Sequence, residues 1–215
     1  MNQSGRIQLL ERIARAASSL ENDRTIVAID GVDGSGKTIF ANELAATLKA
    51  QGQAVIRASV DGFHNPRNVR YLRGKDNPEG YFLDSYNYET LKNDLLIPFL
   101  SGRDQINTAH FDHRTDQEIL STFTVSEKRT ILVFDGIFLH RDELYGLWDL
   151  SLFLDVAFHI TYARMAVRDG SNIDPFAPEN HRYLKGQHLY LRECSPKARA
   201  TLVIDNSSLD VPRIL

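Results

Sequence analysis

The sequence predicts an α/β protein with a mostly parallel sheet that is covered by helices on both faces. Short runs of β-branched and other apolar residues recur along the chain, each dense enough for a strand buried on both faces. Between them lie segments in which apolar residues recur every three or four positions, as in amphipathic helices. This alternation favours parallel pairing. No linker or internal repeat divides the chain, so residues 1–215 are predicted to form one domain.

The elements are predicted in chain order from these patterns. A first helix spans residues 4–20, and a buried strand at 25–30 leads through a glycine-rich turn into a helix at 37–49. Residues 62–86 and 169–180 show no clean period and are predicted as loops. Further strands are predicted at 54–59, 130–135, 150–155 and 200–205, with weaker strand patterns at 106–111 and 122–125. Further helices are predicted at 88–100, 158–167 and 181–193.

The composition excludes several classes of protein. The chain is 42% hydrophobic and 25% charged, which is ordinary for a folded globular protein and unlike a disordered one. Its formal net charge of -3 argues against a protein that coats DNA or RNA. Cys194 is the single cysteine, which excludes an intrachain disulfide and a cysteine-rich zinc site. No apolar run approaches the roughly 18 residues that span a bilayer, and no secretory signal is recognised, so a cytoplasmic protein without membrane partners is expected.

The strongest motif is the segment 31–38, which fits the pattern G-x-x-x-x-G-K-[ST] and lies between a buried strand and a helix. Its glycines let backbone N–H groups turn inward around a polyphosphate, and the start of the next helix adds to the positive field. Lys37 is expected to reach the outer phosphates and Thr38 to ligate Mg²⁺. The residues expected to bind ATP are Gly31, Asp33, Gly34, Ser35, Gly36, Lys37 and Thr38.

Two acidic residues end strands that are predicted to lie near this loop. Asp135 follows an apolar run, as a Walker-B acid does, and is expected to hold Mg²⁺ together with Thr38. Asp61 follows the strand at 54–59 and could accept the proton of a substrate hydroxyl that attacks the γ-phosphate. Since Asp-Gly is also a common turn pair, both acids could be ordinary turn residues.

Basic residues gather in two places. Arg164 and Arg168 share a helix face before the loop 169–180, which predicts a lid within about residues 165–185 that covers charge developing on the phosphoryl group. The alternative to a lid is that these arginines form an ordinary solvent-exposed basic surface of the helix. A second cluster mixes cations and aromatic rings and could bind a nucleoside, an acidic group of a small substrate or single-stranded nucleic acid, the last disfavoured by the net charge. It comprises Arg67, Arg70, Tyr71, Arg73, Lys75, Tyr81, Phe82 and Tyr86.

These motifs resemble the uridine kinase-like branch of the P-loop kinases, which is related to phosphoribulokinase and bacterial pantothenate kinase. The resemblance extends over about residues 24–206. Its most specific segments are Asp-Gly-Phe-His at 61–64 and Pro-Glu-Gly-Tyr at 78–81. The other matching segments are 31–38, 70–74, 84–88, 134–137 and 203–206.

The resemblance implies a five-stranded parallel sheet with a lid and assigns roles to individual residues. Asp61 matches the catalytic base, Thr38 and Asp135 match the magnesium ligands, and Arg164 and Arg168 match arginines that close over the phosphates. The acceptor-binding residues expected from these segments are His64, Arg73, Tyr81 and Asn87, and those expected from the stretch 111–116 are Phe111 and Asp116. Uridine-cytidine kinases have an aspartate where Asn87 stands, and a tyrosine and a histidine where Phe111 and Asp116 stand.

The function predicted from the sequence is therefore an ATP- and Mg²⁺-dependent kinase that phosphorylates a hydroxyl of a small molecule. Uridine or a related nucleoside is the first candidate. Pantothenate, a sugar or a sugar phosphate is the alternative, and a nucleotide-binding switch without turnover is a rival of another class. Nucleic acid is not an expected partner. Members of the family that the chain resembles are often oligomers, so a homo-oligomer is not excluded.

Overall fold

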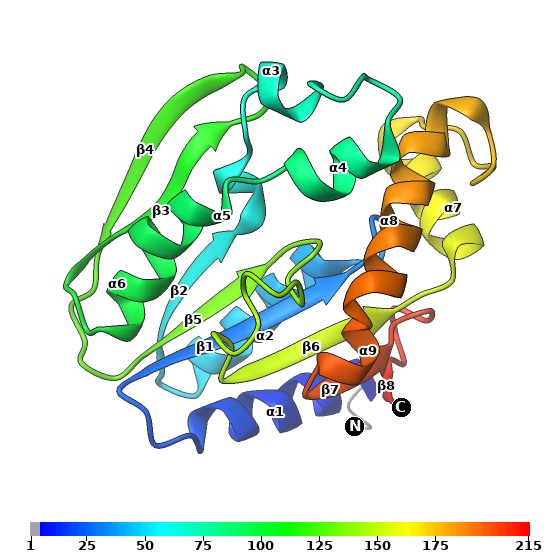
Figure 1. Ribbon diagram of the computed structural model, residues 1–215. Coiled ribbons are helices and arrows are strands. Elements are labelled where there is room, and N and C mark those ends of the chain that lie inside the picture. Colours follow the sequence, from blue (N-terminus) through cyan, green and yellow to red (C-terminus); the bar gives the residue numbers. More distant parts are fainter. Residues whose placement is uncertain (1–4) are drawn as a thin grey trace.

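The computed structural model describes residues 5–215 and contains a six-stranded main sheet (Figure 1). The strand order is β2-β5-β1-β6-β7-β8, in which the first five strands are parallel and β8 is antiparallel to β7. The predicted α/β class with about five parallel strands is thus confirmed, and β8 is an edge strand that the sequence did not indicate. The strands are β1 Arg24–Gly31, β2 Ala54–Ser59, β5 Thr130–Asp135, β6 Leu150–Asp155, β7 Leu202–Asp205 and β8 Arg213–Ile214.

Helices cover both faces of this sheet. Helices α1 (Gly5–Ser18) and α2 (Lys37–Ala50) pack on one face, where Leu44 and Val27 are completely buried. The other face is covered by α4 (Pro78–Asp84), the helical segment 88–100 and α8 (His181–Cys194). Because both faces are covered, every residue of β1 is buried, which explains the apolar run Ile26–Ile29 at its centre.

Strands β3 (Gln105–Asp112) and β4 (Gln117–Thr124) form a separate antiparallel hairpin beyond the β2 edge of the main sheet (Figure 1). The weak strand pattern at 106–111 falls inside β3. The one at 122–125 overlaps the end of β4, which begins five residues before the predicted start and ends one residue before the predicted end. Every residue of β4 is exposed, so its sequence carries no alternation of buried and exposed positions by which its length could be recognised.

The segment 62–86, predicted as a loop, contains two short helices, α3 (Arg67–Arg70) and α4. Asn77 caps helix α4, because its side-chain oxygen accepts a hydrogen bond from the backbone N–H of Gly80 at 2.8 Å. Pro78 is the first helical residue. Helices of four and seven residues are too short to show a hydrophobic period. The start signal Asn-Pro was nevertheless present in the sequence.

The predicted helix at 88–100 is present and contains a π-helical segment in its middle. It runs through α5 (Tyr88–Thr90), a π segment η2 (Leu91–Leu96) and α6 (Ile97–Leu100). Asn87 caps it, because its side-chain oxygen accepts from the backbone N–H of Thr90 at 3.0 Å.

The last third of the chain alternates as the sequence predicts. Helix α7 (Phe158–Asp169) ends at Gly170, which adopts a left-handed φ of 69°. A short turn η3 (Pro178–Asn180) then precedes α8, and α9 (Pro196–Arg199) leads into β7. No helix within residues 5–215 has the length and hydrophobicity of a membrane-spanning segment.

Candidate active site

The phosphate loop connects the end of β1 to the start of α2. Gly34 and Gly36 have φ angles of 73° and 93°, which glycine adopts without strain. A β-carbon at Gly34 would lie 2.5 Å from the carbonyl oxygen of Thr161, so only glycine fits at this position. In the structure the ammonium group of Lys37 donates to the carbonyl oxygen of Val32 at 2.9 Å, which folds the lysine over its own loop. This geometry suits a loop that surrounds an anion with backbone N–H groups.

Asp135 lies directly beside this loop, at the carboxyl end of β5. The Thr38 hydroxyl donates to its Oδ2 at 2.8 Å, and the Arg57 guanidinium lies 2.7 Å from its Oδ1. Asp135 is only 1% exposed, so its charge needs these partners. Within the described part of the chain, no group of three His, Cys, Asp or Glu residues converges as a metal site. A metal ion here would be held by Thr38, Asp135 and phosphate oxygens, which are the hard ligands that Mg²⁺ prefers.

Asp61 lies in the turn η1 (Val60–Phe63) that follows β2, and its carboxylate is exposed. The Tyr86 hydroxyl donates to Asp61 Oδ1 at 3.3 Å, and the imidazole Nδ1 of His64 lies 2.9 Å from the Asp61 carbonyl oxygen. Burial, and then the Asp61 charge, raise the pKa of Tyr86 well above its ordinary value, so this phenol remains a hydrogen-bond donor to Asp61. Burial lowers the pKa of His64.

A single serine joins Asp61 to Asp135. The Ser59 hydroxyl donates to the backbone carbonyl oxygen of Asp135 at 3.1 Å and accepts from the backbone N–H of Asp61 at 3.3 Å. The adjacent strands β2 and β5 place Ser59 opposite Asp135 in the parallel register. The two acids that the sequence singles out therefore stand side by side at the carboxyl edge of the sheet, as expected for a doubly wound fold.

The tip of the phosphate loop is held from two sides. The Tyr81 hydroxyl donates to Asp33 Oδ2 at 2.6 Å, and the side-chain oxygen of Gln187 accepts from the Asp33 backbone N–H at 2.7 Å. Burial and the Asp33 charge raise the pKa of Tyr81 well above its ordinary value. Helices α4 and α8 thus fix the loop, and Tyr81, expected at the acceptor, contacts the phosphate loop in this structure.

Four of the six residues expected to bind the acceptor line one cavity of about 440 Å³, called here the acceptor cavity. His64 stacks on His113 with 4.5 Å between ring centroids, and Asp116 accepts hydrogen bonds from the Arg67 backbone and the Arg70 guanidinium at 2.9 and 3.2 Å. Arg73 does not line this cavity and instead pairs with Asp84 at 2.9 Å. The lining residues are Phe63, His64, Pro66, Asn87, Thr90, His110, Phe111, Asp116 and Glu118.

The two arginines expected over the phosphates both have other partners in this structure. Arg164 donates to the backbone carbonyl oxygens of Asn206 and Ser207 at 2.9 and 2.8 Å. Arg168 pairs with Asp169 at 2.6 Å, and this pair raises the pKa of the guanidinium, with smaller effects from the charges of Asp33 and Asp61. Arg168 is thus within electrostatic range of the phosphate loop but makes no contact with it.

Sequence reasoning missed Asp30, which connects three parts of the site. Its completely buried carboxylate accepts from the Gly31 backbone at 2.7 Å, the His140 imidazole at 2.7 Å, and the Tyr190 hydroxyl. It thereby joins the phosphate loop to the segment after β5 and to α8. The signal was present, because a carboxylate inside an apolar strand must have buried partners. Arg57, Gln187 and His113 were also missed.

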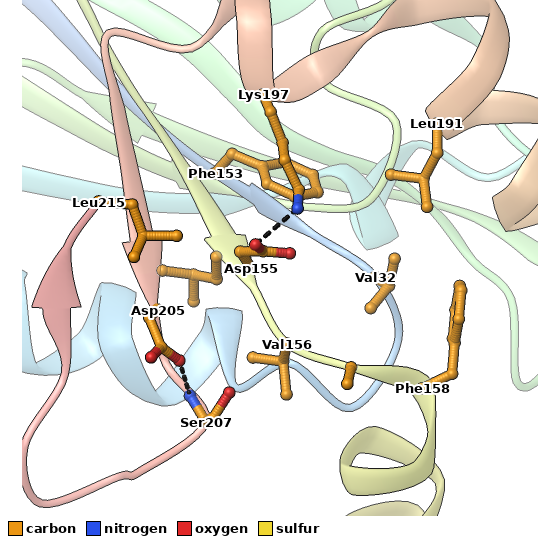
Figure 2. A pocket seen from close by; sticks show the side chains of 12 residues that line it. Val32, Phe153, Asp155, Val156, Phe158, Leu191, Lys197, Asp205, Ser207 and Leu215 are labelled. Atoms are coloured by element: carbon orange, nitrogen blue, oxygen red, sulfur yellow. Dashed lines mark hydrogen bonds and ion pairs between the residues drawn. The ribbon is translucent and has the colours of Figure 1, made fainter.

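A further cavity of about 510 Å³ lies at the carboxyl ends of β6 and β7 (Figure 2). Val32 of the phosphate loop forms part of its wall, together with apolar side chains such as Phe153 and Leu191. The Lys197 ammonium lies 2.6 Å from Asp155 at its border, as Figure 2 shows. None of the residues expected to act in catalysis or to bind ATP, metal or acceptor lines this cavity, although Val32 and Asp205 belong to the matching segments 31–38 and 203–206.

Comparison with known proteins agrees with this geometry. The model of the phosphoribulokinase / uridine kinase family matches residues 26–172. The chain belongs to this family. Uridine kinases of Ureaplasma urealyticum and Shewanella baltica are each 26% identical to it, over 149 and 152 residues, covering 67% of this chain and 68% of theirs. A solved structure described as a possible uridine kinase from Bacillus stearothermophilus is 26% identical, has a TM-score of 0.73, and is matched over 92% of this chain and 97% of that one.

Membership of the phosphoribulokinase / uridine kinase family makes this protein a P-loop kinase, that is, a phosphotransferase with a hydroxyl acceptor. The resemblance inferred from the sequence is confirmed. Kinases of this family in general use ATP and Mg²⁺. The glycine conformations around 31–36 and the oxygen pair of Thr38 and Asp135 fit both groups.

Proposed function

We propose that this protein transfers the γ-phosphate of ATP to a hydroxyl group of a small molecule that binds in the acceptor cavity. The observation that carries the proposal is the link through Ser59, whose hydroxyl bonds to the backbone of both Asp135 and Asp61 and so supports a proposed base close to a proposed metal ligand. A nucleotide-binding switch needs a phosphate loop and a metal ligand, but it needs neither an exposed carboxylate beside them nor a cavity for a second molecule.

Each residue then has a defined task. Lys37 and the backbone N–H groups of the phosphate loop bind the phosphates, while Thr38 and Asp135 hold Mg²⁺, which neutralises charge on the transferred group. Asp61 accepts the proton of the attacking hydroxyl, and Tyr86 orients its carboxylate.

The lid is the second part of the proposal. The segment 169–180 closes over the nucleotide, so that Arg168, and Arg164 after release of its carbonyl partners, cover the phosphates. Ile173 and Phe176 are 61% and 81% exposed in this structure, and closure would bury such apolar side chains.

Uridine or a related nucleoside is the first acceptor to test, because relatives 26% identical to this chain are uridine kinases. Two residues that line the acceptor cavity do not favour a nucleoside. Phe111 can stack on a base but cannot donate a hydrogen bond, and Asp116 is already bound by Arg70. An acidic alcohol such as pantothenate or a sugar phosphate is the second candidate. It is favoured by Arg67 and Lys75, two cations near the cavity that form no ion pair within residues 5–215.

The test is release of ADP by the purified protein with Mg²⁺ and ATP, in the presence of uridine, cytidine, pantothenate and several sugars. We expect ADP release to depend on one class of added alcohol and to stop in Lys37→Ala, a change that removes one hydrogen bond of a half-buried side chain to the Val32 carbonyl oxygen. Release at the same rate without any alcohol would support the switch instead.

A further inference from the structure

A second cavity lies next to the acceptor cavity and has a different chemical character. This basic cavity, of about 610 Å³, is lined by Arg67, Asn68, Tyr71, Lys75 and Tyr183. It lies between α3 with its following loop and the start of α8. Pro66 lines the acceptor cavity and its chain neighbour Arg67 lines the basic cavity, so the start of α3 contributes to both.

Two cations, Arg67 and Lys75, line the basic cavity. Within residues 5–215, neither the Arg67 guanidinium nor the Lys75 ammonium forms an ion pair with a carboxylate. Their basic neighbours differ, because Arg70 pairs with Asp116 and Arg73 with Asp84. Asp116 and Asp84 are thus paired with arginines that do not line the cavity, and the lining itself contains two cations and no carboxylate.

A third charge lies behind the wall. Arg182 is 6% exposed, and its guanidinium donates to four backbone carbonyl oxygens, those of Arg70, Gly74, Lys75 and Asn77, at 3.0 to 3.1 Å. Its hydrogen bonds are satisfied, but its charge meets no carboxylate in the described chain. The Arg182 guanidinium therefore adds a positive charge behind the wall of the cavity, stabilised by carbonyl dipoles and by the rings of Tyr71 and Tyr81.

The aromatic residues connect these charges to the open space. The Arg182 guanidinium lies 4.9 Å from the ring centroid of Tyr71, which forms one wall. Tyr183 forms another wall and packs edge-on against Tyr81, with 5.0 Å between the ring centroids. Tyr81 in turn donates a hydrogen bond to Asp33 of the phosphate loop. Burial raises the pKa of Tyr183, so its phenol is a donor at neutral pH. Two cations and phenol donors around one cavity form a set that recognises an oxyanion.

We propose that the basic cavity binds a phosphate or carboxylate group of the acceptor, so that the alcohol this kinase phosphorylates is an anion. The inference rests on the proposed kinase function and narrows it to the acidic class of acceptors. In this arrangement the acceptor hydroxyl would reach Asp61, which does not line the acceptor cavity but contacts its lining residue His64, while the acidic end would lie on the α3 side. A neutral alcohol would leave these cations without a partner, and sites with unfilled polar groups discriminate strongly.

The first experiment compares acceptors that differ only in the acidic group: pantothenate with panthenol, glycerate with glycerol, and ribulose 5-phosphate with ribulose. Uridine serves as the neutral nucleoside. We expect at least one acidic member to have a KM at least tenfold lower than that of its neutral partner. The double variant Arg67→Gln/Lys75→Gln should raise that KM at least tenfold and leave kcat within about twofold, because both charges act on binding alone. Lys49→Gln, which removes an exposed lysine on α2, is the matched control and should behave as the wild type.

The second experiment measures binding without turnover. Calorimetric titration of the nucleotide-free protein with phenyl phosphate, benzoate and benzyl alcohol should show saturable, salt-sensitive binding of at least one anion and none of the alcohol. The double variant should lose this binding. Equal binding to the wild type and the double variant would assign the anion to the phosphate loop and overturn the proposal.

The two proposals fail in different ways. If neutral and acidic acceptors are phosphorylated equally well and the double variant changes neither, the anion subsite is wrong while the kinase function stands. If no alcohol is phosphorylated but the anion binds and the double variant abolishes binding, the subsite stands and the proposed function is wrong.

Discussion

The guanidinium of Arg57 lies 2.7 Å from the carboxylate of Asp135, on the oxygen that Thr38 does not contact. Asp135 is almost fully buried, and Arg57 supplies its only ionic partner among residues 5–215. An arginine and a magnesium ion would therefore neutralise the same carboxylate from different sides.

This arrangement predicts that Arg57→Gln destabilises the protein by about 1–3 kcal/mol, because a buried carboxylate oxygen loses a charged donor. Thermal unfolding measures the loss. Millimolar Mg²⁺ with ATP should reduce the difference from wild type, since a bound cation replaces part of the missing charge. Arg192→Gln, which removes an exposed pair with Glu193, is the control and should change stability little. Equal unfolding temperatures of Arg57→Gln and wild type would show that the pair contributes nothing.

Asp61→Asn should lower turnover by a factor of about 10²–10⁴, the range for loss of a general base. Its carboxylate is exposed and receives one side-chain hydrogen bond, so the fold and the affinity for ATP without Mg²⁺ should persist. Tyr86→Phe should have a much smaller effect, since it removes the orienting bond and leaves the base. Steady-state kinetics and ATP titrations test both variants. A loss of less than about threefold in Asp61→Asn would place the base elsewhere.

The segment 169–180 should become protected from hydrogen exchange when a bisubstrate analogue binds. It begins at the left-handed Gly170 and carries the exposed side chains of Ile173 and Phe176, features of a segment with low local stability. Mass spectrometry of exchanged peptides resolves this segment from α7 and α8. Identical exchange with and without the analogue would argue against a lid.

Asn87→Asp should improve kcat/KM for uridine, if uridine is an acceptor. The oxygen of Asn87 that caps the helix at Thr90 is kept in aspartate, so the local fold should survive. Residue 87 lines the acceptor cavity, where a carboxylate should bind ribose hydroxyls more strongly than an amide does. Kinetics with uridine and cytidine on both proteins measure the change. Efficient and selective uridine turnover by the wild type would contradict the inference that Asn87 and Phe111 weaken nucleoside binding.

Asp30→Asn should cost about 3 kcal/mol of folding stability, because an amide N–H₂ in place of a carboxylate oxygen leaves buried donors unpaired. Those donors are the Tyr190 hydroxyl and the backbone and side chain of His140. Denaturant unfolding gives the value. Asp155→Asn removes a surface pair with Lys197 and should cost less than about 1 kcal/mol. Equal stability of the two variants would show that Asp30 has no special role.

Much of this molecule follows from patterns in its sequence. The five parallel strands were predicted because strands buried on both faces are continuous apolar runs, such as Ile26 to Ile29. Strand β4 was placed poorly because all its side chains face solvent. The convergence of His64, Asn87, Phe111 and Asp116 on one cavity agrees with their expected role. Three partners could not be predicted, because they depend on contacts between residues that are not neighbours in sequence. Tyr81 binds Asp33, Arg73 pairs with Asp84, and Arg164 donates to the carbonyls at 206–207. The roles of the expected site residues stay predictions until the variants are measured.

The π-helical segment Leu91–Leu96 has a consequence for how acceptor preference could change among relatives. A residue in an α-helix turns the chain by about 100°, and a π turn accommodates one extra residue. Deleting one residue there would convert the segment to α-helix and rotate Asn87 and Thr90, which line the acceptor cavity, relative to α6. Leu91, Leu95 and Leu96 are completely buried, so α6 would remain anchored to the core. A single-residue deletion could thus reshape the mouth of the cavity without any substitution in it, and alignments across 88–100 should be examined for gaps of one residue.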